Sequence, residues 1–234
     1  MYHSFSVGET IKTSWHLVRK NFAMIAIYSL IGFIIILASS TFIYLFVSHD
    51  VFYFSISAVI FLLTLSFIIL GFIKLIFQLL DKEYYDFDFS DIVPSFKMIF
   101  SYLLLFTVVF TLSFALNRAI EHLEEGYAKY ISGIVTGGFI QFFLIFYFPI
   151  CACFIVDDAS GPFESVIQSF FLIRGNFLKY FFLFIIIETM AFVGLATVVG
   201  MLFAVPFGYI ILAVAYRKLI YSHLDVDDNI TETN

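Results

Sequence analysis

The chain contains six apolar segments, most of them as long as the roughly 20 residues that a helix needs to cross a bilayer. Lipid offers no partner for open backbone N–H and C=O groups, so a single apolar segment can cross it only as a helix. Six segments are also too few strands for a membrane barrel. The sequence therefore predicts an all-α, polytopic membrane protein with six transmembrane helices. The predicted segments are 22–47, 51–76, 99–116, 130–156, 177–198 and 201–216.

The composition also indicates an integral membrane protein. Of the 234 residues, 62% are hydrophobic and 13% are charged, whereas soluble domains average about 25% charged residues. So little charge leaves too little polar surface to solvate a soluble globule. The first apolar segment is far longer than the core of a signal peptide, and no small-residue cleavage site follows it. We therefore expect this helix to stay in the protein.

Lysine and arginine residues are divided unequally between the two sides of the predicted membrane. The side of the N-terminus holds ten of them, and the other side holds only Arg118 and Lys129. Because basic residues accumulate on the cytoplasmic side, both termini are predicted to be cytoplasmic. External loops are then expected near His49 and over 117–129, with a tight turn around Gly200.

One stretch of the sequence recurs further along the chain. Residues Glu9–Phe22 align with Glu164–Phe177, and six of the fourteen positions are identical. A chance match between two merely hydrophobic segments would rarely keep polar residues as well. In the first copy the apolar residues fall largely on one helical face, as in a helix lying at the membrane surface. The identical pairs are Glu9/Glu164, Ser14/Ser169, Leu17/Leu172, Arg19/Arg174, Asn21/Asn176 and Phe22/Phe177.

A weaker third copy over Asp91–Ile99 keeps the Ser-aromatic pair and little else. Two apolar segments follow each copy, so every unit returns the chain to the same side of the membrane. The sequence thus predicts one domain over 1–222, built of three repeats of an amphipathic interfacial helix plus a helical hairpin. The predicted repeats are 1–81, 86–156 and 162–222, followed by a polar, disordered cytoplasmic tail over 223–234.

Two arginine-asparagine pairs, Arg19 with Asn21 and Arg174 with Asn176, stand where an interfacial helix is expected to turn into a transmembrane helix. Backbone groups freed at such a corner need polar partners. The Asn side chain can cap the incoming helix, and the Arg can hold a lipid phosphate or the carbonyls that end the first helix. The alternative is an arginine that merely extends to the membrane surface beside an incidental asparagine. We expect the two outer corners to be built alike and the middle one to differ.

The second copy carries a resemblance to a known family, through Phe163, Ser165, Ser169, Leu172, Arg174, Asn176 and Phe177 and the preceding residues 155–158. This pattern resembles the membrane domain of some bacterial glycerophosphoryl diester phosphodiesterases and related six-helix membrane protein families of unknown function. The resemblance implies a helical module of the bacterial cytoplasmic (inner) membrane without chemistry of its own. The catalytic barrel of those enzymes is not expected, because no segment outside the membrane is long enough to build one.

Two polar residues inside predicted transmembrane segments are candidates for a functional or helix-bridging role. Glu188 is about midway along the fifth segment, where an ionisable group is costly and usually faces a cavity or a partner. It is a candidate proton or ligand site, or else a neutral carboxyl bonded to a neighbouring helix. Gln141 in the fourth segment is of a type that more often bridges helices than binds a substrate.

Small residues at four-residue spacing mark two faces on which helices can approach closely. One face contains Gly133 and Gly137, and the other contains Gly200, Ala204 and Gly208. Both are expected to be packing seams, inside the fold or between subunits.

Four further residues concern packing. Pro149 and Pro206 are expected to kink their helices. Cys151 and Cys153 are predicted to pack in the core as small hydrophobic residues.

The sequence shows no catalytic motif, metal-ligand spacing, cofactor fingerprint or basic cluster. We therefore expect no enzymatic activity, no metal or other cofactor and no nucleic-acid partner. The leading hypothesis is a non-enzymatic membrane module, either an accessory subunit of an envelope complex or a lipid-associated scaffold. Its expected partners are membrane lipids and other membrane proteins. The alternative is a small transporter or lipid-flipping component with a site near Glu188.

Overall fold

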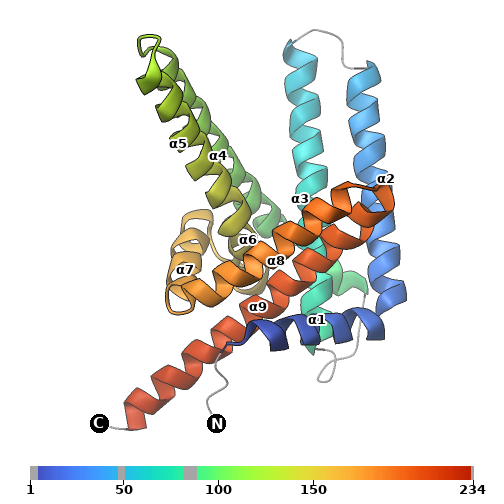
Figure 1. Ribbon diagram of the computed structural model, residues 1–234. Helices are drawn as coiled ribbons and strands as arrows, with labels where there is room; N and C mark the ends of the chain where they lie inside the picture. Colours follow the sequence, from blue (N-terminus) through green and yellow to red (C-terminus); the bar gives the residue numbers. More distant parts are fainter. Residues whose placement is uncertain (1–4, 47–50, 82–88, 233–234) are drawn as a thin grey trace.

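The computed structural model describes residues 5–46, 51–81 and 89–232. Over these residues the chain forms nine α-helices and one short 3-10 helix, with no strand (Figure 1). Six of its helical spans are long and apolar enough to cross a membrane, so the protein is an all-α integral membrane protein. The elements are α1 Val7–Lys20, α2 Phe22–Phe46, α3 Val51–Asp81, η1 Phe89–Ile92, α4 Phe96–Glu121, α5 Tyr127–Phe146, α6 Phe148–Asp157, α7 Pro162–Arg174, α8 Phe177–Leu195 and α9 Val198–Glu232.

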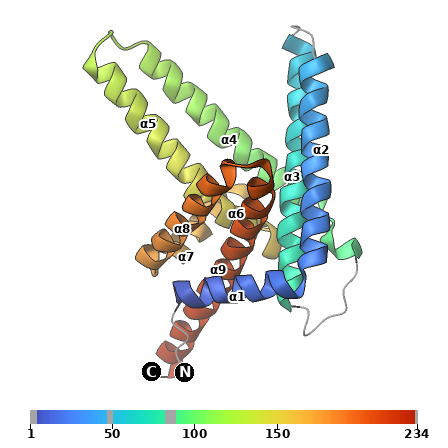
Figure 2. The ribbon, with the colours of Figure 1, turned by 45° about the vertical axis from the view of Figure 1, so that its right-hand side comes forward.

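Three helical hairpins, α2–α3, α4–α5 and α8–α9, spread apart from a common base (Figures 1 and 2). Figure 2 shows α1 lying across this base, below the α2–α3 hairpin. The core lies at this base, where α3, α6 and α9 meet, and each of these helices contacts the other two. We call these three the inner helices. Most core residues fall in the stretches 70–79, 146–156 and 210–219.

Small side chains allow the inner helices to lie close together. Ala213 and Ala215 on α9 and Ala152 on α6 are almost completely buried. Cys151 and Cys153 are buried, unpaired thiols of the same core, which confirms their predicted packing role.

The elements that precede the hairpins pack in a cyclic order. Helix α1 packs on α9, η1 packs on α3, and α7 packs on α6. Each therefore contacts the inner helix of another hairpin. Three equivalent repeats, each packing its first element on the preceding repeat in the cycle, would give this cyclic arrangement. The repeat organisation itself and the domain boundaries stay predictions.

Helices α1 and α7 bury matching faces. Ser14 on α1 and Ser169 on α7 are fully buried, and each hydroxyl donates to the carbonyl four residues earlier, at 2.8 and 2.6 Å. Thr10 and Ser165, at aligned positions, are also fully buried. Because these side chains are small and bonded within their own helix, α1 and α7 can lie close against the inner helices without leaving unpaired hydroxyls.

The two outer corners share one backbone geometry. Asn21 has φ −121° and ψ 27°, and Asn176 has φ −130° and ψ 28°. The helix breaks at both positions, so neither interfacial helix runs unbroken into the next one, in agreement with the sequence-based expectation. The middle corner differs, because η1 is a short 3-10 turn and not an amphipathic α-helix. Pro94 prevents a continuous helix there, and Ser95 caps α4 by accepting a bond from the Met98 N–H.

Two predicted boundaries change in the structure. The fourth segment breaks at Tyr147 into α5 and α6, because Pro149 has no N–H to donate to the preceding turn. Its predicted kink is confirmed, whereas Pro206 lies inside a continuous α9. Helix α9 also continues to Glu232, into the segment predicted to be disordered, since no Gly or Pro follows Gly208 to end it. Residues 233–234 and the expected loop at His49 lie outside the described residues.

Candidate functional site

A groove opens between the α1–α2 corner and the α8–α9 hairpin. Its volume is about 1120 Å³. We call it the interfacial groove and define it by Trp15 and Arg19 of α1, Ala26 and Leu30 of α2, Val193 of α8 and Phe207 of α9.

Two aromatic pairs join the α1–α2 corner to α9 across this groove. The Trp15 and Phe207 rings meet edge to face with centroids 5.8 Å apart. The rings of Phe22 and Phe203 stack with centroids 6.3 Å apart. Such pairs add to the energy of apolar burial, so they stabilise the contact between the α1–α2 corner and α9.

Arg19 provides the charge of the groove. It is the one ionisable residue among the described residues of the lining. Its guanidinium carbon lies 5.8 Å from the centre of the Trp15 ring, and the side chain is exposed and makes no ion pair with any described residue. The groove therefore combines one available cation with apolar walls.

The two hydroxyl groups of the lining are already bonded within the protein. The Ser29 hydroxyl donates to the Ile25 carbonyl at 2.7 Å, and the Thr197 hydroxyl oxygen accepts the Gly200 N–H at 2.9 Å. An occupant of this groove would thus meet hydrocarbon along most of its length. Such a surface suits an apolar chain.

A second, smaller cavity of about 360 Å³ lies between α2, α3 and α9. It shares Ser29, Leu202 and Pro206 with the interfacial groove. The Tyr28 hydroxyl at its wall donates to the Ile68 carbonyl at 3.0 Å. The start of α9 therefore borders both cavities.

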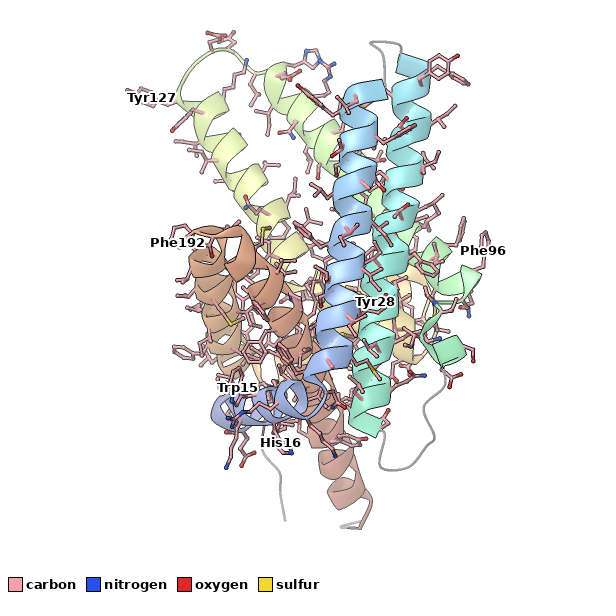
Figure 3. The ribbon with its side chains drawn as sticks, turned by 90° about the vertical axis from the view of Figure 1, so that its right-hand side faces the viewer. Trp15, His16, Tyr28, Phe96, Tyr127 and Phe192 are labelled. Atoms are coloured by element: carbon pink, nitrogen blue, oxygen red, sulfur yellow. The ribbon has the colours of Figure 1, made fainter. Side chains whose placement is uncertain are left out.

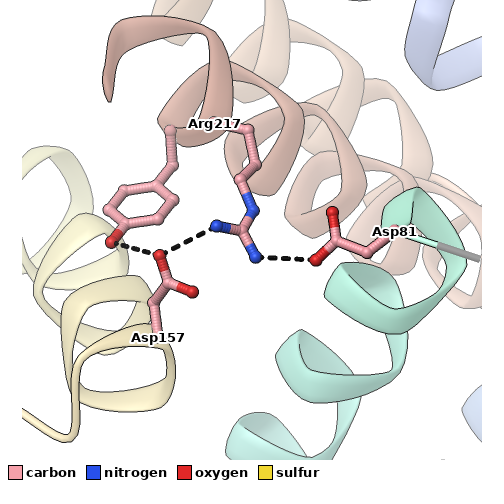
Figure 4. A network of polar contacts seen from close by, with 4 residues as sticks. Asp81, Asp157 and Arg217 are labelled. Atoms are coloured by element: carbon pink, nitrogen blue, oxygen red, sulfur yellow. Dashed lines mark hydrogen bonds and ion pairs between the residues drawn. The ribbon is translucent and has the colours of Figure 1, made fainter. Parts of the chain in front are cut away.

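Charged side chains join the C-terminal ends of α3 and α6 to the middle of α9 (Figure 4). We call these side chains the inner ion-pair cluster. Arg217 of α9 donates to Asp157 of α6 at 3.0 Å and to Asp81 of α3 at 2.9 Å. The Tyr216 hydroxyl donates to the same Asp157 oxygen at 3.1 Å. The Arg217 guanidinium also lies 4.5 Å above the centre of the Phe77 ring. These contacts link the three helices, and the buried Arg217 Nε is the guanidinium nitrogen without a hydrogen-bond partner among the described residues.

Sequence reasoning missed this cluster. Asp157 entered only within residues 155–158 of the family resemblance, and no role was predicted for Asp81 or Arg217. One signal was available in the sequence: Asp81 and Asp157 each follow the last apolar segment of a predicted repeat. Next to the cluster, desolvation by partial burial raises the pKa of the Asp158 carboxyl, and the neighbouring Asp157 carboxylate adds to this increase.

The structure does not bring the predicted intramembrane polar residues together. Glu188 is half-buried on α8 and lies outside the lining of the interfacial groove, although Met190 of the same helix belongs to it. Gln141 on α5 is exposed. Neither makes a hydrogen bond or ion pair with another described residue, so the expected helix-bridging role of Gln141 is not seen in the described part of the chain.

The predicted asparagine caps are wrong. The Asn21 side chain donates to the Leu17 carbonyl at 3.2 Å, so it caps the end of α1 and not the start of α2. Asn176 makes no side-chain cap bond. An N-cap side chain needs an extended backbone, which neither residue has with ψ near 27°. Arg174 is exposed at its corner and lines neither described cavity.

The two predicted glycine seams have different surroundings. A Cβ atom on Gly200 would lie 2.8 Å from the Gly194 carbonyl oxygen, and one on Gly208 would lie 3.2 Å from Ile187. Ala204 is buried in the same seam between α8 and α9. Around Gly133 and Gly137, apart from the neighbouring backbone of α5 itself, no described atom lies within 4 Å of an added Cβ, so this face does not pack inside the fold. Packing between subunits stays a prediction for it.

No protein-family model, curated protein or solved structure matches this chain. The resemblance to the phosphodiesterase membrane domain therefore stays a prediction. Among the described residues, no group of three or more His, Cys, Asp or Glu side chains is placed to hold a metal ion.

Proposed function

We propose that this integral membrane protein is a non-enzymatic, lipid-associated scaffold that holds a membrane lipid in the interfacial groove. The observation that carries the proposal is the groove itself, an apolar cavity of about 1120 Å³ with a single cation, Arg19. Ligand pockets for small molecules measure about 300–1,000 Å³, so the groove is large enough for a long acyl chain. Cofactors and nucleic acids have no part in this function.

The scaffold role is supported by the way the inner helices are held. Arg217 links α9 to both α3 and α6, and the residues around this contact are densely buried. In the accessory-subunit form of the proposal, the open α5 face at Gly133 and Gly137 is where another membrane protein would pack.

Filling the interfacial groove is expected to remove the lipid. Ala26 lines the groove on α2, so Ala26→Phe places a ring in the space that the acyl chain would occupy. We expect the fraction of protein that retains a lipid to fall on the order of tenfold. The acyl chain would have to overpack against the new ring, and overpacking typically costs about 1–3 kcal/mol. Native mass spectrometry after purification in mild detergent measures this fraction.

Ala38→Phe is the matched control, since Ala38 is an exposed residue of the same helix and lies outside the groove. It should leave lipid retention unchanged. Equal retention by both variants would contradict the proposal. Flipping of labelled lipids by the purified protein in vesicles, lost on Glu188→Gln, would favour the transporter alternative.

We also propose the bacterial cytoplasmic (inner) membrane as the location, with both termini in the cytoplasm. In that orientation the α4–α5 connection faces outward. A reporter cysteine at Glu124 should react with a membrane-impermeant thiol reagent in intact cells, and one at Thr13 on the exposed face of α1 should react only after permeabilisation. Both native cysteines are buried and add little background. The reverse labelling pattern would overturn the orientation.

A further inference from the structure

We infer that the occupant of the interfacial groove is an anionic phospholipid of the leaflet that borders α1, with its phosphodiester at Arg19 and an acyl chain along α2. This inference rests on the proposed function, since it requires a lipid in the groove. To the proposed function it adds the class of the headgroup, the leaflet in which the lipid lies, and the residue that binds the headgroup.

The length of the groove matches the thickness of one leaflet of the bilayer. Its lining on α2 extends from Phe22 to Leu30, which is roughly 12 Å at 1.5 Å per residue. The lining also includes Thr197 and Gly200 at the α8–α9 turn. Half of a hydrocarbon core of about 30 Å is about 15 Å, so the groove has the length of a single leaflet.

Figure 3 shows the same relation between the helices. Trp15 on α1 lies at the base of α2, whereas Phe192, near the end of α8, lies well below the far ends of α2 and α3. Helix α1 is amphipathic and exposes Lys12 and Arg19, as in a helix at the lipid-water boundary. A lipid with its headgroup beside α1 would therefore direct its chain into the groove.

The charges around Arg19 select the headgroup. A guanidinium is suited to bidentate binding of a phosphate, and the neighbouring indole of Trp15 is a typical side chain of the membrane interface. The acidic residue of α1, Glu9, lies 3.8 Å from the Lys218 ammonium. No carboxylate occurs among the described residues of the lining, so nothing there would bind the amine of a zwitterionic headgroup. The site therefore favours net negative lipids.

Arg174 provides an internal comparison. It occupies the aligned position at a corner with the same backbone geometry, and it is exposed in the same way. It lines neither described cavity. General attraction of anionic lipids to surface arginines would affect both residues equally, whereas a built lipid site depends on Arg19 alone.

The test uses the full chain reconstituted in vesicles of equimolar phosphatidylglycerol and phosphatidylethanolamine with identical acyl chains. Native mass spectrometry then identifies the lipid that stays bound after extraction. We expect the wild-type protein to retain phosphatidylglycerol preferentially. Arg19→Gln should lower this preference about tenfold, the effect of losing one charge-assisted contact with the headgroup at a defined site. Lys12→Gln and Arg174→Gln should keep the wild-type preference.

The outcomes separate this inference from the proposed function. A lipid that is retained and is lost on Ala26→Phe, but shows no headgroup preference, would overturn the inference and leave the proposed function standing. Equal loss of preference in Arg19→Gln and Arg174→Gln would also overturn it, because it would indicate surface attraction only. Failure of Ala26→Phe to reduce retention would contradict the proposed function itself. Circular dichroism of each variant checks that the helices have formed.

Discussion

Arg217→Met is expected to lower the free energy of unfolding by about 2–3 kcal/mol, because it removes two charge-assisted hydrogen bonds from a partly buried ion-pair cluster. Arg217 contacts Asp157 at 3.0 Å and Asp81 at 2.9 Å, and only 21% of its side chain is exposed. Without the arginine, two carboxylates face each other near the core with no positive charge between them. Unfolding in mixed micelles of increasing SDS content, followed by circular dichroism, measures the change.

The chain contains a matched control for this variant. Arg118 pairs with Glu121 at 2.8 Å, but both side chains are more than 60% exposed. Arg118→Met should therefore cost no more than about 1 kcal/mol. Adding Asp81→Asn and Asp157→Asn to Arg217→Met should restore much of the lost stability, because it removes the unpaired charges. Equal effects of Arg217→Met and Arg118→Met would show that the cluster does not join the inner helices.

Gly194→Ala is expected to destabilise the protein by about 1–3 kcal/mol through overpacking. The added methyl group would lie 2.7 Å from the Ala204 Cβ atom and 3.1 Å from the Gly200 carbonyl oxygen. Neither atom belongs to a flexible side chain, so α8 and α9 would have to separate. The same SDS titration measures the loss. Trp15, the single tryptophan, contacts Phe207 of α9, so its fluorescence reports whether α9 has moved.

Gly133→Ala tests whether the effect belongs to the seam. Nothing described lies within 4 Å of the new Cβ atom, and alanine is the better helix former, so this variant should be as stable as the wild type or slightly more stable. A large loss of stability in Gly133→Ala, or none in Gly194→Ala, would contradict the packing described here. A changed oligomeric state in Gly133→Ala would favour an interface between subunits on α5.

The sequence alone determined the class of protein, the number of long apolar helices and the helix breaks at Asn21 and Asn176. These features depend on hydropathy and helical spacing within about 20 neighbouring residues, so they can be read without knowing the fold. The break near Pro149 was predictable for the same reason, since a missing N–H acts within one turn.

The tertiary structure alone decided which helices meet. Asp81, Asp157 and Arg217 come from three helices far apart in the chain, and only their packing shows that they form one cluster. Likewise, Gly194 lies in a tight seam and Gly133 beside open space, although both occur in apolar helices. In lipid, helices gain no hydrophobic energy by choosing one neighbour over another, so shape and a few polar contacts select the partners. The interfacial groove is a consequence of that selection, because it exists only where α1 and α2 meet the α8–α9 hairpin.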